Sequence, residues 1–239
     1  MDALKERTVG QIVAEDYRAA QVFRTYGLDF CCGGTKTIEE AAATTGADPT
    51  EVKKALEDLG SQGEAQENYN EWALDFLTDY IINNHHQFVR NKMPEIEAYA
   101  KKVAKVHGDR HPELHEIYKQ VTELHVDLVD HLNKEEAVLF PYIKQLTEAE
   151  KNGAVPENGD VDGAADPVSM MEEEHDEAGE TMANIRDLSS DFTPPEDACT
   201  TYSVLFQNLE GFEKDLHKHV HLENNILFPK ALELEKRLN

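Results

Sequence analysis

The chain has 239 residues, 40% of them hydrophobic, which is enough to bury a sizeable core. With 23 basic and 48 acidic residues its formal net charge is −25, so nucleic acid and anionic membranes are not expected partners. No apolar run reaches the roughly 18 residues that span a bilayer, and no signal-peptide pattern is present. Three cysteines are too few for a disulfide framework. These features predict a folded protein in the reducing cytoplasm.

The first part of the chain is predicted to form a small helical domain. Thr37, followed three residues later by Glu40, forms a capping box that opens one helix. Small polar residues and glycines at 60–67 are typical of a linker. We therefore expect a small domain at residues 1–66 and a larger one at 67–239. Helices in the small domain are predicted to start at Thr8, Tyr17, Thr37 and Pro49.

The larger domain contains four long helical patterns, because apolar residues recur three and four positions apart. A polar segment rich in Gly, Asp, Asn and Pro at 151–166 separates the second pattern from the third. Four long helices predict an all-α four-helix bundle preceded by the small helical domain. The expected helices cover residues 69–106, 112–148, 167–189 and 195–237.

One motif occurs twice in the bundle. His131 and Glu135, four residues apart, precede Leu-Phe-Pro in the second helix, and His219 and Glu223 have the same spacing and the same sequel in the fourth. Residues four apart lie on one face of a helix, so each pair presents an imidazole and a carboxylate in the same direction. Solvated surface pairs would be the plain explanation, but repetition favours a metal site. The proline is expected to mark a helix irregularity near that site.

The other two helices also offer histidines. A lone core histidine is usually hydrogen-bonded rather than a metal ligand, but His175 is the single candidate in the third helix. In the first helix His85 and His86 are both possible, and helical periodicity does not choose between them. A bundle-core site draws ligands from facing helices, so both helices are expected to contribute.

Imidazole and carboxylate ligands without thiolate suit iron or manganese better than structural zinc. Two glutamates can bridge two metals, with histidines as terminal ligands. Six side chains and a bridging oxygen would leave about one open position on each octahedral metal, where O2 or NO could bind.

Further segments extend the pattern over nearly the whole chain: DFCCGG at 29–34, HxxxRxxMPEI from His86, HLNKEEAVLFP from His131, MEEEHDEAGE from Met171, TPPEDACTTY from Thr193 and HVHLENNILFP from His219. With these segments the chain resembles the iron–sulfur cluster repair di-iron proteins, whose bundle is hemerythrin-like. The resemblance implies two non-haem irons in an oxo-bridged pair, and repair of clusters damaged by oxidative or nitrosative stress.

The resemblance also implies a ligand set. The family's first-helix histidine is followed by Arg and Pro at fixed offsets, which here selects His86 because Arg90 and Pro94 fit. Glu136, Glu174 and His221 are interpreted as non-ligands, with His221 in solvent; Glu136 points about 100° from the ligand stripe, so its replacement is expected to matter little. The implied metal ligands are His86, His131, Glu135, His175, His219 and Glu223.

The resemblance gives Cys31 and Cys32 a role as a redox or transfer pair, whereas composition alone would make them small buried residues. Thiolates can hold iron or be nitrosated, which is compatible with that role. Damaged iron–sulfur proteins are the implied partners, and iron supply is one implied route of repair. An NO-reducing di-iron enzyme and an O2 or NO sensor or carrier are the alternatives. The sequence assigns neither a catalytic residue nor an oligomeric state.

Overall fold

The computed structural model describes residues 6–60, 68–153 and 163–238. These residues form helices, with one isolated bridge between Thr8 and Thr37, so the all-α class is confirmed. The expected linker at 60–67, apart from Gly60 at the end of α4, and most of the polar segment at 151–166 lie outside the described residues. The boundary expected at residue 66 therefore stays a prediction.

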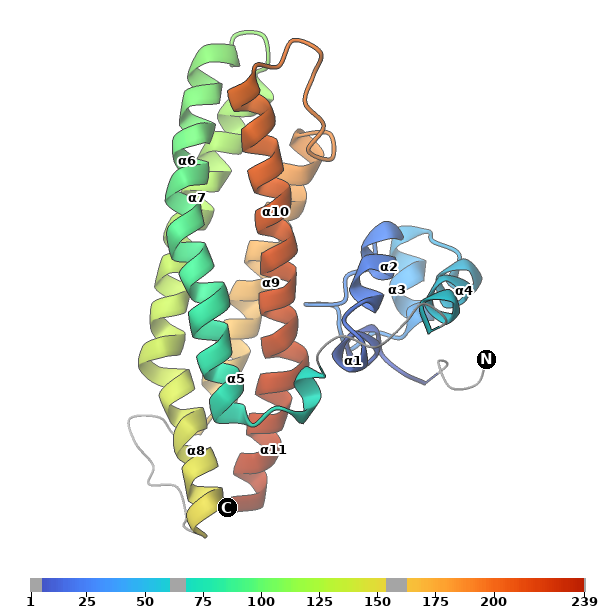
Figure 1. Ribbon diagram of the computed structural model, residues 1–239, viewed down its shortest axis with the longest axis vertical. Coiled ribbons are helices and arrows are strands. Elements are labelled where there is room, and N and C mark those ends of the chain that lie inside the picture. The colour runs from blue at the N-terminus through green and yellow to red at the C-terminus, as the bar shows by residue number, and fades with distance from the viewer. Residues whose placement is uncertain (1–5, 61–67, 154–162, 239) are drawn as a thin grey trace. The chain divides into compact units, whose positions relative to one another are not determined.

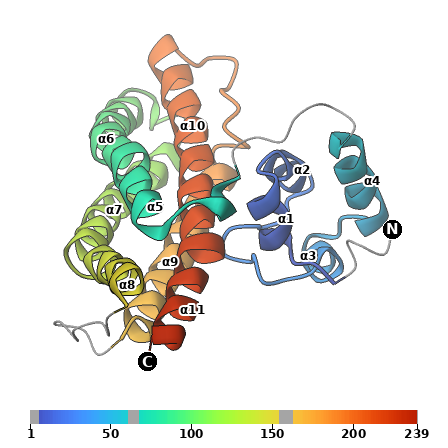
Figure 2. The same ribbon diagram turned by 60° about the horizontal axis from the view of Figure 1, so that its bottom comes forward.

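The chain forms two compact units, and the first comprises 1–78, 144–156 and 218–239. Its short helices begin close to the predicted residues (Figure 2). The Thr8 and Thr37 hydroxyls each accept a hydrogen bond from the backbone three residues on, which completes two capping boxes. Gly46 ends α3 with a φ of +77°, a conformation that costs a glycine little. The short helices are α1 (Val9–Glu15), α2 (Ala19–Thr25), α3 (Ile38–Thr45), α4 (Pro49–Gly60) and the 3-10 turn η2 (Tyr69–Glu71).

The second unit comprises 79–143 and 157–217. In this unit α6 (Gln87–His107) packs against α7 (Glu113–Lys134), and α7 packs against α9 (Ala165–Leu188). Helix α6 has a single apolar stripe, since its buried side chains recur every three or four residues, as one face of a helix requires. The stripe consists of Val89, Met93, Ile96, Ala100 and Val103.

Four long helical stretches form the predicted four-helix bundle (Figure 1). Their bounds agree with the predicted helices to within a few residues. One stretch is the single helix α9, and each of the others is interrupted by a π-helical turn. The three interrupted stretches are α5 (Leu74–Ile81), η3 (Ile82–His86) and α6; α7, η4 (Glu135–Leu139) and α8 (Phe140–Asn152); and α10 (Thr200–Leu222), η5 (Glu223–Leu227) and α11 (Phe228–Leu238).

The π-helical turns confirm the predicted irregularity. Pro141 and Pro229 follow η4 and η5 closely, and a proline cannot donate the backbone hydrogen bond of a regular helix. Loosening the preceding turn to a π-helix accommodates that loss, and π-helical turns are frequent at functional sites. None of the described helices is both long and apolar enough to cross a membrane.

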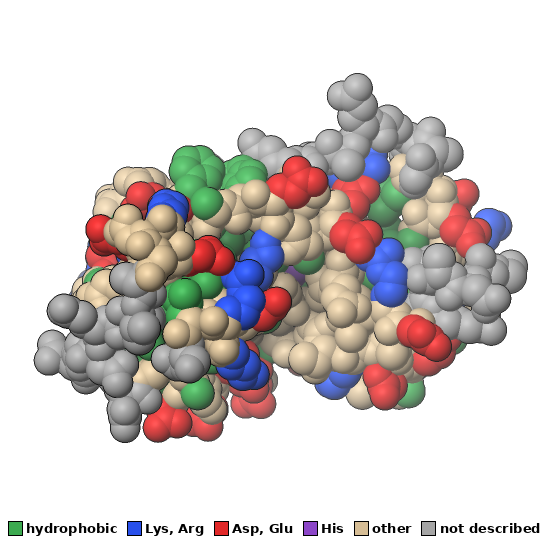
Figure 3. Space-filling model, turned by 90° about the horizontal axis from the view of Figure 1, so that it is seen from below, with side chains coloured by type: hydrophobic (Ala, Val, Ile, Leu, Met, Phe, Trp, Pro, Cys, Tyr) green, Lys and Arg blue, Asp and Glu red, His purple; other side chains and the backbone are tan. Residues whose placement is uncertain are grey.

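Acidic and basic side chains are intermixed on the described part of the face drawn in Figure 3. Within the first unit, Lys151 contacts Asp75 at 2.6 Å and Arg237 contacts Glu150 at 2.8 Å. Exposed ion pairs of this kind stabilise a fold by at most about 1 kcal/mol each.

An ion pair in the second unit should make stability depend on pH. His111 Nε2 lies 3.0 Å from Asp197 Oδ1, and His111 Nδ1 lies 3.1 Å from Glu113 Oε1. The hydrogen bond with Asp197, aided by Glu113 and opposed by partial desolvation, raises the pKa of His111. The pair therefore stabilises the fold fully below the unfolded-state pKa of about 6.5, and this contribution is lost as pH rises through the higher folded-state pKa.

We expect Asp197→Asn to lower the pKa of His111, measured by NMR titration. It should also reduce the difference between the melting temperature measured below the unfolded-state pKa of His111 and the one measured above its folded-state pKa. Asp109→Asn, which removes a nearby carboxylate, is the control and should leave the His111 titration as in the parent. An unchanged titration in Asp197→Asn would show that the pair does not set the pKa.

Candidate metal centre

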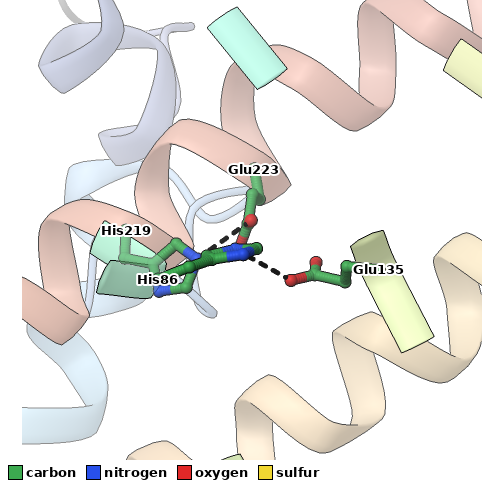
Figure 4. A group of neighbouring side chains, drawn as sticks. All are labelled: His86, Glu135, His219 and Glu223. Atoms are coloured by element: carbon green, nitrogen blue, oxygen red, sulfur yellow. Dashed lines mark hydrogen bonds and ion pairs between the residues drawn. The ribbon is translucent and has the colours of Figure 1, made fainter. Parts of the chain in front are cut away.

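Two groups of four side chains carry atoms suited to hold metal ions. The first group is His86, Glu135, His219 and Glu223, and the ligand atoms all lie within 4.8 Å of one another (Figure 4). The second group, with the same spacing, contains Glu135 and Glu223 again. All members of both groups are buried. The two carboxylates therefore belong to both groups and lie near the ligand atoms of all four histidines. The second group is His131, Glu135, His175 and Glu223.

The π-helical turns supply several of these side chains. His86 ends η3, and Glu135 and Glu223 begin η4 and η5. Figure 4 shows the His86 and His219 rings converging with the Glu135 and Glu223 carboxylates. A π-helical turn widens the helix by one residue, which changes the face to which the following side chains point. The local irregularity therefore helps to bring the carboxylates into the groups.

Both nitrogens of His86 are engaged. Nε2 lies 3.3 Å from Glu135 Oε2, inside the group, and Nδ1 lies 2.8 Å from Glu136 Oε1. Arg90 donates to the same Glu136 oxygen at 2.6 Å. Burial raises the pKa of Glu136, but the hydrogen bonds from His86 and Arg90 outweigh it and hold the pKa below its usual value. Glu136 is thus an ionised acceptor that orients His86 with Nε2 toward the group.

His131 has the same arrangement on another carboxylate. Its Nε2 lies 3.4 Å from Glu135 Oε2, and its Nδ1 lies 2.8 Å from Glu174 Oε2. Lys134 donates to the other oxygen of Glu174 at 2.6 Å. Burial alone would raise the pKa of Glu174, but the contacts with Lys134 and His131 lower it overall. Carboxylates that accept from the outer nitrogen of a histidine are typical of metal-ligating histidines.

The remaining histidines complete the groups. His175 Nε2 lies 3.0 Å from His131 Nε2, and His219 Nε2 lies 3.0 Å from Glu223 Oε1. Glu135 and Glu223 are each 0% exposed, and imidazoles surround them in both groups. Burying ionised carboxylates is costly unless a cation compensates their charge. The donor set of imidazoles and carboxylates therefore fits iron, manganese or a similar divalent ion.

The structure separates the two neighbouring histidines of the first helix. His86 lies in the metal group, whereas His85 Nδ1 contacts Asp215 Oδ1 at 3.0 Å. Sequence periodicity could not make this choice. The predicted solvent position of His221 is wrong, because the residue is 0% exposed and burial lowers its pKa to about 3.

Glu136 and Glu174 were expected to be only acidic neighbours. Neither belongs to a metal group, but each accepts from a histidine that does. Glu136 does point away from the ligand stripe of its own helix, and for that reason it reaches His86 on the neighbouring stretch. No sequence signal other than Arg90, four residues after His86, pointed to this contact.

The cysteine pair forms a third, separate cluster with Asp29. Asp29 Oδ1 accepts from the backbone N–H of Cys31 at 3.0 Å and of Cys32 at 3.1 Å. Cys31 is 6% exposed and Cys32 is half-buried. The hydrogen bond with Cys32, burial and the nearby negative charge of Asp29 raise the pKa of the Cys31 thiol well above its usual range. The buried thiol is therefore held in its protonated form.

Family models match both parts of the chain. The model described as the hemerythrin HHE cation binding domain matches residues 77–231, which include both metal groups. The bundle is therefore a hemerythrin-type cation-binding domain. A second model, described as a domain of unknown function, matches residues 5–60.

Curated relatives cover nearly the full length. The iron–sulfur cluster repair protein YtfE of Pectobacterium atrosepticum is 36% identical over 96% of this chain and 98% of its own. YtfE of Escherichia coli O81 is likewise 36% identical, with the same coverage of both chains. A probable iron–sulfur cluster repair protein of Haemophilus influenzae is 38% identical over 90% of this chain and 91% of its own. The chain belongs to this family of iron–sulfur cluster repair proteins.

The two kinds of carboxylate should respond differently to amidation. Glu135→Gln or Glu223→Gln removes the charge shared by both metal groups, and we expect at least a 100-fold loss of iron affinity. Glu136→Gln leaves the groups intact but removes the ionised acceptor of His86, so a loss of about 10- to 100-fold is expected.

Competition with a chelator, followed by iron analysis, measures these affinities. Glu173→Gln, an exposed change on α9, is the control and should bind iron as the parent does. Parent-like iron affinity in Glu135→Gln would contradict the role of the buried carboxylates.

Proposed function

We propose that this protein repairs damaged iron–sulfur clusters and that its bundle holds a di-iron centre. The observation that carries the proposal is the sharing of Glu135 and Glu223 by two groups of buried ligands. Four histidines and two carboxylates make up the two groups, and each carboxylate is counted in both. A single metal ion does not need so many ligands. Two ions bridged by the carboxylates account for both groups.

In this proposal each ion has two terminal histidines. His86 and His219 would hold one ion, His131 and His175 would hold the other, and Glu135 and Glu223 would be shared by both. Support comes from the contacts of His86 with Glu136 and of His131 with Glu174, which leave Nε2 of each ring facing the shared carboxylate. Iron is the proposed metal, in an oxo-bridged pair.

A bound iron pair would supply exchangeable iron and redox chemistry, together with open positions for small ligands such as NO or O2. The chain's own residues contribute the rest. Glu136 and Glu174 keep the outer nitrogens of His86 and His131 occupied and thereby hold the rings in place. Burial of Glu135 and Glu223 would strengthen their attraction for a bound cation, because water does not screen the interaction there.

The proposed partners are proteins with damaged iron–sulfur clusters, because the relatives are named as iron–sulfur cluster repair proteins. Iron supply is the proposed route, with Cys31 and Cys32 taking part in the transfer. The cytoplasm is the proposed location. NO reduction at the iron pair and simple binding of O2 or NO are the competing functions.

The metal stoichiometry tests the centre. We expect close to two irons per chain after anaerobic purification, measured by elemental analysis, with an absorption spectrum typical of an oxo-bridged pair. His86→Ala should lose iron or alter the spectrum more than His85→Ala, because only His86 belongs to a metal group. A single zinc per chain, or the reverse order of the two variants, would overturn the di-iron proposal.

Recovery of a damaged cluster enzyme tests the repair activity. The Cys31→Ser, Cys32→Ser double variant should keep its iron and spectrum but restore the enzyme poorly, since Cys31 and Cys32 belong to neither buried metal group. Cys199→Ser is the matched control, because this cysteine is remote in sequence and is exposed. Repair at the parent rate would remove the cysteines from the mechanism.

An anaerobic assay of N2O formed from NO, with a reductant present, distinguishes the competing enzyme function. Repair without N2O formation supports iron supply. N2O formation at a rate that matches the repair would replace it with NO reduction.

A further inference from the structure

The side chain of Asn225 joins the cysteine loop to the helical stretch that carries Glu223. Asn225 lies in the π-helical turn η5, two residues after Glu223. Its Nδ2 donates to the carbonyl of Cys31 at 3.0 Å and to the carbonyl of Phe30 at 3.3 Å. Both residues belong, with this turn, to the same compact unit. The amide therefore satisfies two carbonyls at the start of the cysteine loop.

Two glycines make room for this amide. A Cβ atom on Gly34 would lie 2.0 Å from Asn225 Oδ1, and its three nearest neighbours would all be atoms of the Asn225 amide. A Cβ atom on Gly10 would lie 2.1 Å from the same oxygen. Both distances are far too short for nonbonded atoms. A larger residue at either position would have to displace the Asn225 amide, so the close approach of Asn225, and not backbone conformation, favours glycine here.

A buried ring supports the contact from the same stretch. His221 Nδ1 lies 3.3 Å from Asn225 Nδ2, and the His221 ring packs edge-on against Phe30 with centroids 5.9 Å apart. The Tyr17 ring packs against the same His221 ring, with centroids 6.0 Å apart. His221 and Asn225 are four residues apart, so they lie on one face of their helical stretch. Glu223 belongs to the same stretch. This face therefore contacts the cysteine loop through the hydrogen bonds of Asn225 and the packing of His221 against Phe30.

We propose that Asn225 is a positioning residue that holds the Cys31–Cys32 loop closed against the stretch carrying Glu223. The role rests on the proposed repair function, in which the cysteines act together with the metal centre. Asn225 touches neither metal nor thiol in this role. It keeps Cys31 buried, and it links the loop to the segment that contributes a carboxylate and a histidine to the metal groups.

The proposal can be tested by the isosteric change Asn225→Asp in the iron-loaded full-length chain. The variant keeps the side-chain shape, but it loses both donated hydrogen bonds and places a carboxylate oxygen against two carbonyls. The rate at which a chromogenic aromatic disulfide labels Cys31 reports how often the loop opens. Cys31 is followed in a Cys32→Ser, Cys199→Ser background, and we expect labelling about tenfold faster or more.

Asn184→Asp is the control. It makes the same change of an asparagine to an aspartate at an exposed position of α9, in the other compact unit. It should label Cys31 at the parent rate. Iron content and the metal absorption spectrum should remain those of the parent in both variants, whereas repair, measured with the native cysteines, should fall only in Asn225→Asp.

A double-mutant cycle isolates the contact. Gly34→Ala should speed labelling in the parent, because its new methyl group collides with the Asn225 amide. In an Asn225→Ala background the colliding atoms are gone, so Gly34→Ala should add little. This strong non-additivity distinguishes a specific closed contact from a general loss of stability.

Parent-like labelling of Cys31 in Asn225→Asp, or additive effects in the cycle, would overturn the proposal. Loss of iron from Asn225→Asp but not from Asn184→Asp would overturn it as well, because Asn225 would then support the metal ligands directly. If the parent chain fails to repair clusters while the labelling results hold, the repair function fails and the closed contact stands.

Discussion

Burial of two carboxylates is the constraint on which the rest of the structure depends. Glu135 and Glu223 are fully buried among imidazoles, and ionised carboxylates in such surroundings need compensating positive charge. The four-helix bundle supplies the scaffold, because ligands on facing helices can converge in its core. The π-helical turns adjust the direction of the side chains, and the surrounding acidic partners hold the histidine rings.

The carboxylates that contact the histidines have two different roles. Glu136 and Glu174 are partly exposed and kept ionised by Arg90 and Lys134, while Glu135 is fully buried. The outer carboxylates can therefore orient rings without facing the metal groups. This division explains why two acidic residues next to each other in the chain, Glu135 and Glu136, have different predicted responses to amidation.

The small domain depends on a different kind of contact. Its cysteine loop is organised from within by Asp29 and is held from outside by Asn225 and His221, which follow the metal-ligand candidates His219 and Glu223 in the chain. Movement of this helical stretch would therefore disturb the hydrogen bonds of Asn225 to the cysteine loop. The same few residues thus connect the cation-binding domain with the cysteine pair.

The sequence by itself determined the all-α fold, the four long helices and the repeated His–Glu pairs, because each follows from spacing along one helix. Helical periodicity could not choose between His85 and His86, and only the family resemblance favoured His86, since the choice depends on a π-helical turn and on which face meets the neighbouring helices. Contacts between distant segments were also beyond its reach. The burial of His221, the partnership of Glu136 with His86 and the fit of Asn225 between two glycines were decided only by tertiary packing.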